Sequence, residues 1–138
     1  MAYEHGSKAV ILIAERDQSV RELQLFFLSN AGFSVEFADD GQCAIDRVRH
    51  NPPALLITEI LIPKIDGLTL CRLVRDDPAL SAMPVLVFSI LAAATRATDA
   101  GAAGFLRKPL VESTFLAAIN GAMMSTTPNS TDAVAGVR

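Results

Sequence analysis

The sequence has few of the residues that build metal sites and disulfide bonds. It contains only two cysteines and two histidines in 138 residues. Cys43 and Cys71 fall inside predicted helices without CxxC spacing, and neither His5 nor His50 lies near them in the sequence. A zinc site is therefore not expected. Two helical cysteines and a polar N-terminus without a signal-peptide pattern fit a reducing cytoplasm, where we expect the protein to act.

The sequence also lacks a long apolar run and an excess of positive charge. Its longest apolar run is interrupted by Thr58, Glu59 and Pro63, well short of a membrane span. We therefore expect a soluble protein that binds no membrane. A formal net charge of -3 gives no electrostatic reason to expect direct binding to nucleic acid.

The composition is that of a globular chain. Hydrophobic residues make up 51% of the sequence and charged residues 20%, which argues against a disordered or fibrous protein. A chain of this length can bury about two thirds of its unfolded surface in one domain. We assign residues 8–124 to that domain, residues 1–7 to an N-terminal extension, and the small, polar residues 125–138 to a disordered tail or linker.

Strand and helix patterns alternate five times along the predicted domain. Short apolar or alternating runs predict strands, and apolar residues at helical spacing predict the helices between them. The predicted strands cover residues 9–14, 33–38, 55–59, 85–89 and 104–107. Right-handed crossovers wind such a chain into a doubly wound, parallel α/β sheet with helices on both faces.

Two of the predicted helices differ in how well their sequences define them. In the first, Ser19 is the expected N-cap and Gly32 the expected stop. The residues at helical spacing on its predicted inward face are Val20, Leu23, Phe27 and Ala31, with Phe26 and Leu28 widening that face. The fourth predicted helix, over residues 92–100, has little apolar bulk. We expect that helix to be weak enough to be mobile or to depend on a partner.

The third predicted strand ends in a carboxylate. It is almost entirely apolar from Leu55 onward, follows two prolines, and is closed by Pro63 and by the Asp66-Gly67 turn. Such a strand is typical of the buried centre of a parallel sheet. Glu59 is the last residue of the strand and so stands at the carboxyl end, beyond which open α/β sheets bind ligands. Taken alone, a glutamate at this position is more often a solvated strand-end residue.

Polar residues follow three further strands at the same edge of the predicted sheet. Glu15, Arg16 and Asp17 follow the first strand, Ser89 ends the fourth, and Lys108 follows the fifth. Each position alone is weak evidence, because strand-end serines are common caps and a lysine before proline is commonly exposed. Because the carboxyl ends of parallel strands share one edge, together they predict a single site.

Five segments give the chain a specific resemblance to a known family. They are ILIAERDQSVR (11–21), ADDG (38–41), PALLITEILIPKIDG (53–67), PVLVFS (84–89) and GAAGFLRKPL (101–110). From residue 8 to about residue 124 the chain resembles a receiver domain of the two-component response regulators, the CheY-like superfamily. The resemblance implies the flavodoxin-like, CheY-like form of the parallel sheet, with strand order 2-1-3-4-5. In that family, the resemblance implies, an aspartate ending the third strand accepts a phosphoryl group from a histidine kinase. An acidic pair after the first strand holds Mg²⁺ beside it.

Part of the site matches the family residue by residue. The resemblance makes Ser89 and Lys108 the hydroxyl and the lysine that contact the phosphoryl oxygens. It makes Phe105 the aromatic residue that changes rotamer with the active state.

The phosphoacceptor and the acidic pair do not match. Glu59 stands where the family has its acceptor aspartate, and Glu15 and Arg16 stand at the acidic pair, with Asp17 at the adjoining position. The chain therefore resembles an atypical receiver.

These departures oppose both phosphorylation of the strand end and binding of Mg²⁺. Glutamate moves its carboxylate about 1.5 Å further from the backbone, whereas in-line attack needs reacting atoms about 3 to 3.5 Å apart. Glu59 should be a poor phosphoacceptor. A guanidinium at Arg16 would oppose a divalent ion by several kcal/mol. We expect no metal and no cofactor; if Mg²⁺ did bind, Glu15, Glu59 and the backbone of Leu61 would hold it.

The charges at this edge balance without an ion. Glu15 and Glu59 contribute two negative charges, and Arg16 and Lys108 two positive ones. We predict that an ion pair from Arg16 or Lys108 to Glu59 replaces the metal and phosphoryl bridge. The expected function is that of a non-enzymatic pseudo-receiver, regulating through a histidine kinase, an output domain or another signalling protein. The expected contact face comprises the fourth helix, fifth strand and fifth helix.

Two alternatives remain. The first is a conventional phosphorelay receiver that accepts a phosphoryl group on Glu59 or another carboxylate, with Mg²⁺. The second is a flavodoxin-type FMN enzyme, which the strand–helix order also permits. This second alternative is disfavoured because the acidic residues after the first strand would repel a phosphate.

Overall fold

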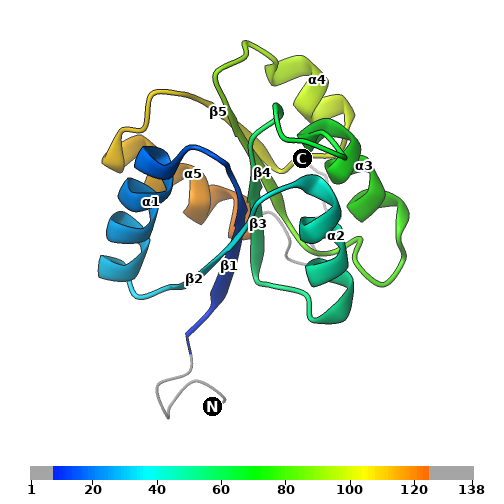
Figure 1. The fold of residues 1–138 in the computed structure, drawn as a ribbon, viewed down its shortest axis with the longest axis horizontal. Coiled ribbons are helices and arrows are strands. Elements are labelled where there is room, and N and C mark those ends of the chain that lie inside the picture. The colour runs from blue at the N-terminus through cyan, green and yellow to red at the C-terminus, as the bar shows by residue number, and fades with distance from the viewer. Residues whose placement is uncertain (1–7, 125–138) are drawn as a thin grey trace, which may run out of the picture.

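The computed structural model describes residues 8–124, which form one five-stranded parallel sheet of order β2-β1-β3-β4-β5 (Figure 1). The elements are β1 (Val10–Ala14), α1 (Gln18–Asn30), β2 (Ser34–Ala38), α2 (Gly41–His50), β3 (Leu55–Thr58), α3 (Gly67–Asp76), β4 (Val85–Ser89), α4 (Ala94–Asp99), β5 (Gly104–Arg107) and α5 (Glu112–Met124). The predicted fold class and strand order are confirmed. The extension and tail predicted over residues 1–7 and 125–138 lie outside the described residues.

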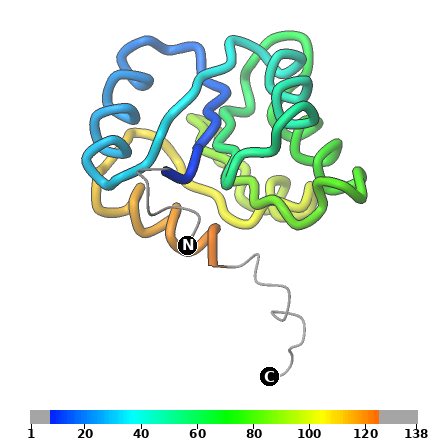
Figure 2. Tube along the Cα trace, turned by 90° about the horizontal axis from the view of Figure 1, so that it is seen from below, coloured from blue at the N-terminus to red at the C-terminus, as the bar shows by residue number. Residues whose placement is uncertain are grey.

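Helices cover both faces of the sheet. Figures 1 and 2 show α1 and α5 on one face and α2, α3 and α4 on the other. Along β1, Ile11 and Ile13 join the buried apolar cluster under α1 and α5, whereas Leu12 and Ala14 join the cluster on the opposite face. This alternation follows from the two-residue period of a strand. The central strands β1, β3 and β4 are therefore buried on both sides. For β3, this burial was predicted from the apolar run at Leu55.

The helix predicted over residues 92–100 is shorter than expected. It covers only Ala94–Asp99, and its N-cap Ala93 makes no side-chain hydrogen bond to the first turn. Alanine cannot satisfy the unpaired N–H groups of a helix start, so the helix begins later than its composition suggested. None of the helices in the described part of the chain is long and apolar enough to cross a bilayer.

The first helix corrects two sequence-based predictions. Its N-cap is Asp17, whose carboxylate accepts hydrogen bonds from the N–H groups of Ser19 (2.9 Å) and Val20 (3.2 Å), so Ser19 is not the cap. Leu23 and Phe26, both predicted on the inward face, are 46% and 60% exposed. The buried residues of the helix are Leu28, as predicted, and Gln24, which was not predicted. The prediction failed because apolar residues surround most of this helix, so their spacing does not define one buried side.

Gln24 is a polar residue inside the core. Its side chain is completely buried, and neither its amide nitrogen nor its carbonyl oxygen has a hydrogen-bond partner within residues 8–124. A buried polar group without a partner costs about 1 to 3 kcal/mol of stability. Gln24 therefore lowers the stability of the packing between α1 and the sheet.

Replacing this glutamine with a leucine of similar size should stabilise the fold. We expect Gln24→Leu to raise the free energy of unfolding by about 1 to 3 kcal/mol, because it removes the unpaired amide and adds apolar contact. Urea denaturation measures this change. Gln42→Leu, at an exposed position of α2, is the control and should change stability by less than about 0.5 kcal/mol. Equal effects of the two substitutions would contradict the interpretation.

Candidate functional site

The pairing of β1 with β3 brings two carboxylates together at the carboxyl edge of the sheet. Ala14 is in register with Thr58, and the N–H of Glu59 donates to the carbonyl of Ala14 at 3.0 Å. Glu15 and Glu59, which directly follow these two paired residues, are therefore neighbours. Both are buried, with relative exposures of 3% and 5%.

The pairing of β4 with β5 adds a hydroxyl and an ammonium group. Ser89 is in register with Arg107, and the N–H of Lys108 donates to the carbonyl of Ser89 at 2.8 Å. Lys108 is thereby placed beside the end of β4, and its ammonium lies 5.5 Å from the centre of the Phe88 ring. The hydroxyl and the lysine that follow different strands reach the same edge as the two carboxylates.

Close packing at the start of α3 limits the space behind Glu59. A Cβ atom added at Gly67 would lie 2.2 Å from the carbonyl oxygen of Glu59 and 2.9 Å from the Cα of Ile60. The N–H of Gly67 also donates to the carbonyl of Ile60 at 2.9 Å. Glycine is required here so that α3 can approach the turn that follows β3.

Lys108 joins the two carboxylates in what we call the charged cluster, Glu15, Glu59, Ser89 and Lys108. Its Nζ lies 2.9 Å from Oε1 of Glu15 and 3.0 Å from Oε1 of Glu59. The side chains of the three charged residues are only 12%, 4% and 6% exposed for Lys108, Glu15 and Glu59. One ammonium group thus bridges two buried carboxylates that would otherwise repel each other.

The carboxylate of Glu59 is surrounded by further donors. Its Oε2 accepts hydrogen bonds from the hydroxyl of Ser89 and from the backbone N–H groups of Ile60 (2.6 Å) and Leu61 (3.1 Å). Its Oε1 accepts from the backbone N–H of Ile90 at 3.3 Å, besides its contact with the lysine. A glutamate side chain therefore receives hydrogen bonds from three loops at once.

These contacts shift the pKa values of Glu59 and Lys108 away from neutral pH. Burial by itself raises the pKa of Glu59, but the hydrogen bonds from Ser89, Leu61 and Lys108 outweigh it and hold the pKa below its ordinary value. Burial by itself lowers the pKa of Lys108, but hydrogen bonds and attraction to Glu15 and Glu59 outweigh it and hold that pKa above its ordinary value. Both groups consequently stay charged throughout the neutral pH range.

Two predicted site residues lie outside the charged cluster. Arg16 is exposed and forms no ion pair with Glu59 in the described part of the chain, so of the two expected cations only Lys108 takes that role. Asp17 directs its carboxylate to the first turn of α1 instead of into the site. The demands of the helix start explain this, because a free aspartate at that position satisfies two N–H groups.

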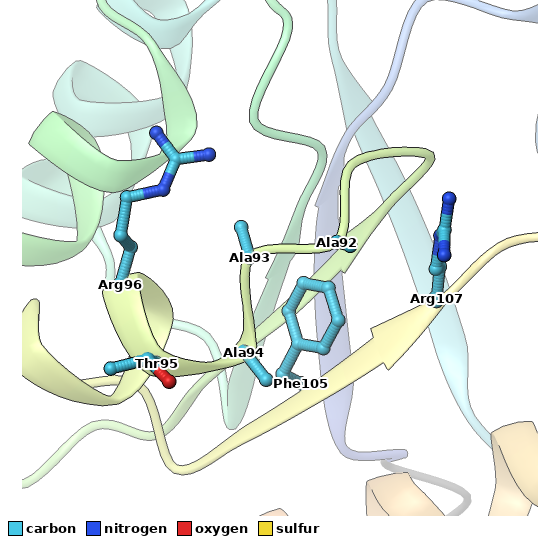
Figure 3. Close-up of a pocket in the computed structure, with 7 residues that line it drawn as sticks. All are labelled: Ala92, Ala93, Ala94, Thr95, Arg96, Phe105 and Arg107. Carbon is cyan, nitrogen blue, oxygen red and sulfur yellow. The ribbon is translucent and has the colours of Figure 1, made fainter.

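Phe105, the expected switch aromatic, is half-buried on β5 and packs against the apolar cluster beneath α3 and α4. Its ring lies in a depression of about 330 Å³ between the β4–α4 turn and β5. Figure 3 shows the ring among the alanines of the turn, with Arg96 and Arg107 on opposite sides. The depression is lined by Ala92, Ala93, Ala94, Thr95, Arg96, Phe105 and Arg107. This patch, which we call the α4–β5 depression, combines an apolar floor with two guanidinium groups.

Sequence reasoning missed the backbone donors of the site. The N–H groups of Ile60 and Ile90 bind Glu59, yet their apolar side chains give no sign of it. The relevant signal is positional, because a turn that leaves a parallel strand directs N–H groups toward the edge of the sheet. Residue type alone does not reveal them.

Fold and site together define the class of protein. A doubly wound parallel sheet with acidic, hydroxyl and lysine side chains at its carboxyl edge is the architecture of a receiver domain in two-component signalling. A family model, the response regulator receiver domain, matches residues 11–120, and the chain belongs to this family.

Known relatives agree with this assignment. The response regulator MprA of Mycobacterium sp. (strain KMS) is 34% identical over 125 residues, which cover 86% of this chain and 52% of the relative. The chain thus spans about half the length of the curated relatives it matches. A putative response regulator from Chloroflexus aurantiacus J-10-fl has a similar structure, with a TM-score of 0.81, 30% identity, and coverage of 86% of this chain and 99% of the other. Chemotaxis response regulator CheY4 of Vibrio cholerae shares the fold, with a TM-score of 0.76, 24% identity, and coverage of 83% and 98%.

The Mg²⁺ that the family implies does not fit the residues present here. Both carboxylates, Glu15 and Glu59, already pair with the ammonium of Lys108. Arg16, the residue after Glu15, is exposed, and its guanidinium offers Mg²⁺ no oxygen ligand. Within residues 8–124, no three or more His, Cys, Asp or Glu side chains are grouped as a metal site requires.

Removing the bridging ammonium should destabilise the domain strongly. We expect Lys108→Met to lower the free energy of unfolding by about 3 to 5 kcal/mol, because it leaves two buried carboxylates without a counter-charge. Urea denaturation at neutral pH measures the loss. The control is Lys64→Met, which removes an exposed lysine 3.5 Å from Asp40 and should cost less than about 1 kcal/mol. Similar losses in both variants would show that the bridge contributes little.

Proposed function

We propose that the chain is an atypical receiver domain that regulates by binding a protein partner, independently of phosphorylation and Mg²⁺. The supporting observation is that the carboxylate of Glu59 accepts hydrogen bonds from the hydroxyl of Ser89, the ammonium of Lys108 and three backbone N–H groups. These are the donors that a phosphoryl group on this strand end would need. In this chain an internal carboxylate uses them.

A tethered carboxylate competes well with an incoming phosphate. It loses no translational freedom on binding, whereas a phosphodonor does. Its own oxygens are also the nucleophile that would have to attack phosphorus, and they are held by Ser89 and Lys108. Both properties favour a glutamate that fills the site over one that is phosphorylated.

The filled site also holds the turn that leads to α4. Ile90 donates its N–H to Glu59 at 3.3 Å, Leu91 donates its N–H to the hydroxyl of Ser89 at 3.2 Å, and Arg107 donates to the carbonyl of Ile90 at 3.2 Å. Glu59 thereby fixes one conformation of the β4–α4 turn. The domain would hold a single signalling state constitutively, or be switched by a partner in place of phosphate.

The face of α4, β5 and α5 is the proposed contact surface for that partner. The α4–β5 depression offers an apolar floor at Phe105 and two arginines, and Val111 adds an apolar side chain that is 51% exposed. A histidine kinase, an output domain or another signalling protein is the expected partner. The function proposed is signalling in the cytoplasm without catalysis and without direct binding to nucleic acid.

A conventional phosphorelay receiver is the alternative function. The hydroxyl and lysine at Ser89 and Lys108 favour it, because they match the family positions that contact a phosphoryl group. It would require Glu59 or another carboxylate to accept the group, and Lys108 to release both of its partners.

Treatment with a small acyl phosphate distinguishes the two functions. After incubation with acetyl phosphate and Mg²⁺, we expect the intact mass of the wild-type protein to be unchanged, because the carboxylate of Glu59 is held and no metal site is formed. The double variant Glu59→Asp with Arg16→Asp should gain the mass of one phosphoryl group, since it restores the family residues. A mass gain in the wild type, mapped to Glu59, would overturn the proposal.

Charge reversal beside the α4–β5 depression tests the proposed contact face. Arg96→Glu should reduce capture of the partner from the source cell at least tenfold, because it replaces a guanidinium at the edge of the depression by a carboxylate. Arg72→Glu, on the exposed side of α3, is the matched control and should leave capture unchanged. Affinity capture with quantitative mass spectrometry provides the measurement, and equal capture by the two variants would move the contact elsewhere.

A further inference from the structure

The outer side of α1 is unusually apolar. Of the seven large apolar side chains that are exposed within residues 8–124, three lie on this one helix: Leu23 (46%), Leu25 (44%) and Phe26 (60%). The helix does contain polar residues, but Gln24 is turned into the core. An ordinary surface helix directs its apolar residues inward, whereas α1 carries them on its outer side as well as on the side that buries Leu28.

Phe26 is an anchor beside a shallow depression. Its ring contacts that of Phe27 edge to face, with centroids 5.9 Å apart, which restricts its motion. The depression measures about 380 Å³ and is lined by Glu22, Leu25, Phe26, Ser29 and Asn30. We call these five residues the α1 patch. A partly exposed aromatic ring next to a depression of this kind is a common element of protein interfaces.

The polar residues of the α1 patch are symmetric about Phe26. Glu22 lies four residues before the ring and Asn30 four residues after it. Because residues four apart lie on the same side of a helix, these three side chains form one ridge. Glu22 supplies a carboxylate acceptor at one end of the ridge, and Asn30 an amide donor at the other.

We propose that α1 forms an antiparallel homodimer contact with α1 of a second copy, centred on Phe26. About a two-fold axis at this residue, Glu22 of one copy faces Asn30 of the other, and the reverse pair forms at the opposite end. The two phenylalanine rings then meet at the axis. Each copy covers the apolar side chains of the other without bringing like charges together.

The charges of the patch favour a second copy over a charged partner. Glu22 is its only charged residue, and its carboxylate already accepts a hydrogen bond from Gln18 at 3.3 Å. A strongly basic or acidic partner would find little to pair with, whereas an identical, nearly neutral ridge is complementary to itself.

A helix of this length is about 20 Å long, so the contact is smaller than a standard interface and the dimer should be weak.

This inference is independent of the proposed function. Helices α1 and α4 cover opposite faces of the sheet (Figures 1 and 2), so a contact through α1 leaves the α4–β5 depression accessible. Failure of one proposal therefore does not imply failure of the other.

Sedimentation velocity over micromolar to millimolar concentrations tests the dimer. We expect the wild-type domain to show a concentration-dependent monomer–dimer equilibrium, and Phe26→Ser to weaken it at least tenfold. Leu61→Ser, which removes another large exposed apolar side chain, 56% exposed, at the carboxyl edge, should leave it unchanged. A protein that stays monomeric throughout, or an association that Arg96→Glu abolishes and Phe26→Ser does not, would overturn the proposal.

Disulfide crosslinking tests the orientation with Phe26 intact, and so does not depend on the folding of the serine variant. In a Cys43→Ser background, which removes the exposed native thiol, Glu22→Cys and Asn30→Cys are prepared separately. An antiparallel contact predicts rapid crosslinking when the two variants are mixed and little crosslinking of either alone. Crosslinking of each variant with itself would indicate a parallel contact. No crosslinking in any mixture would indicate that α1 is not an interface. Either outcome would contradict the proposal.

Discussion

The ammonium group of Lys108, held between the carboxylates of Glu15 and Glu59, is the interaction on which the site depends. Two buried carboxylates at adjacent strand ends cannot both remain ionised without a nearby positive charge. In a receiver that binds Mg²⁺, the metal can supply that charge; here a lysine within 3.0 Å of both groups supplies it. The cluster is electrostatically compensated by the chain itself.

The length of the Glu59 side chain decides which hydrogen-bond donors it reaches. The longer side chain of glutamate brings its carboxylate to the hydroxyl of Ser89 and to the N–H of Ile90 on the β4–α4 turn. These donors come from parts of the chain about thirty residues away from Glu59, so the side chain links the end of β3 to the end of β4. The side chain of Glu59 thus has a structural role, because it ties the turn that leads to α4 to the end of β3.

The helix α1 illustrates a different constraint. Its sequence is apolar on most sides, and the buried side is selected by packing against the sheet and α5, which encloses Gln24 and Leu28 and leaves Phe26 outside. An unpaired amide inside and an aromatic ring outside are both unfavourable in an isolated domain. Of the two, only the exposed ring of Phe26 bears on the proposed contact, because Gln24 faces the core.

The sequence by itself determined the fold class and the edge at which the site forms, and its resemblance to receiver domains supplied the strand order. Apolar runs such as the one at Leu55 specify strands, and parallel strands necessarily bring residues such as Ser89 and Lys108 to one edge. These properties depend on local pattern and chain connectivity, which a single sequence contains. The same pattern placed Glu59 directly after its strand, so the location of the site could be predicted before any contact was known.

Only the tertiary structure decided which of these side chains meet. The sequence offered both Arg16 and Lys108 as partners for Glu59, and the fold selects Lys108 because β5 directs it across the ends of β4 and β3, while Arg16 remains exposed beside the start of α1. It likewise gives Asp17 to the helix cap and adds backbone donors, such as the N–H of Ile90, that no side chain announces. Such choices depend on distances between residues that are far apart in the chain, and those distances are set by packing, which the spacing of residue types does not encode.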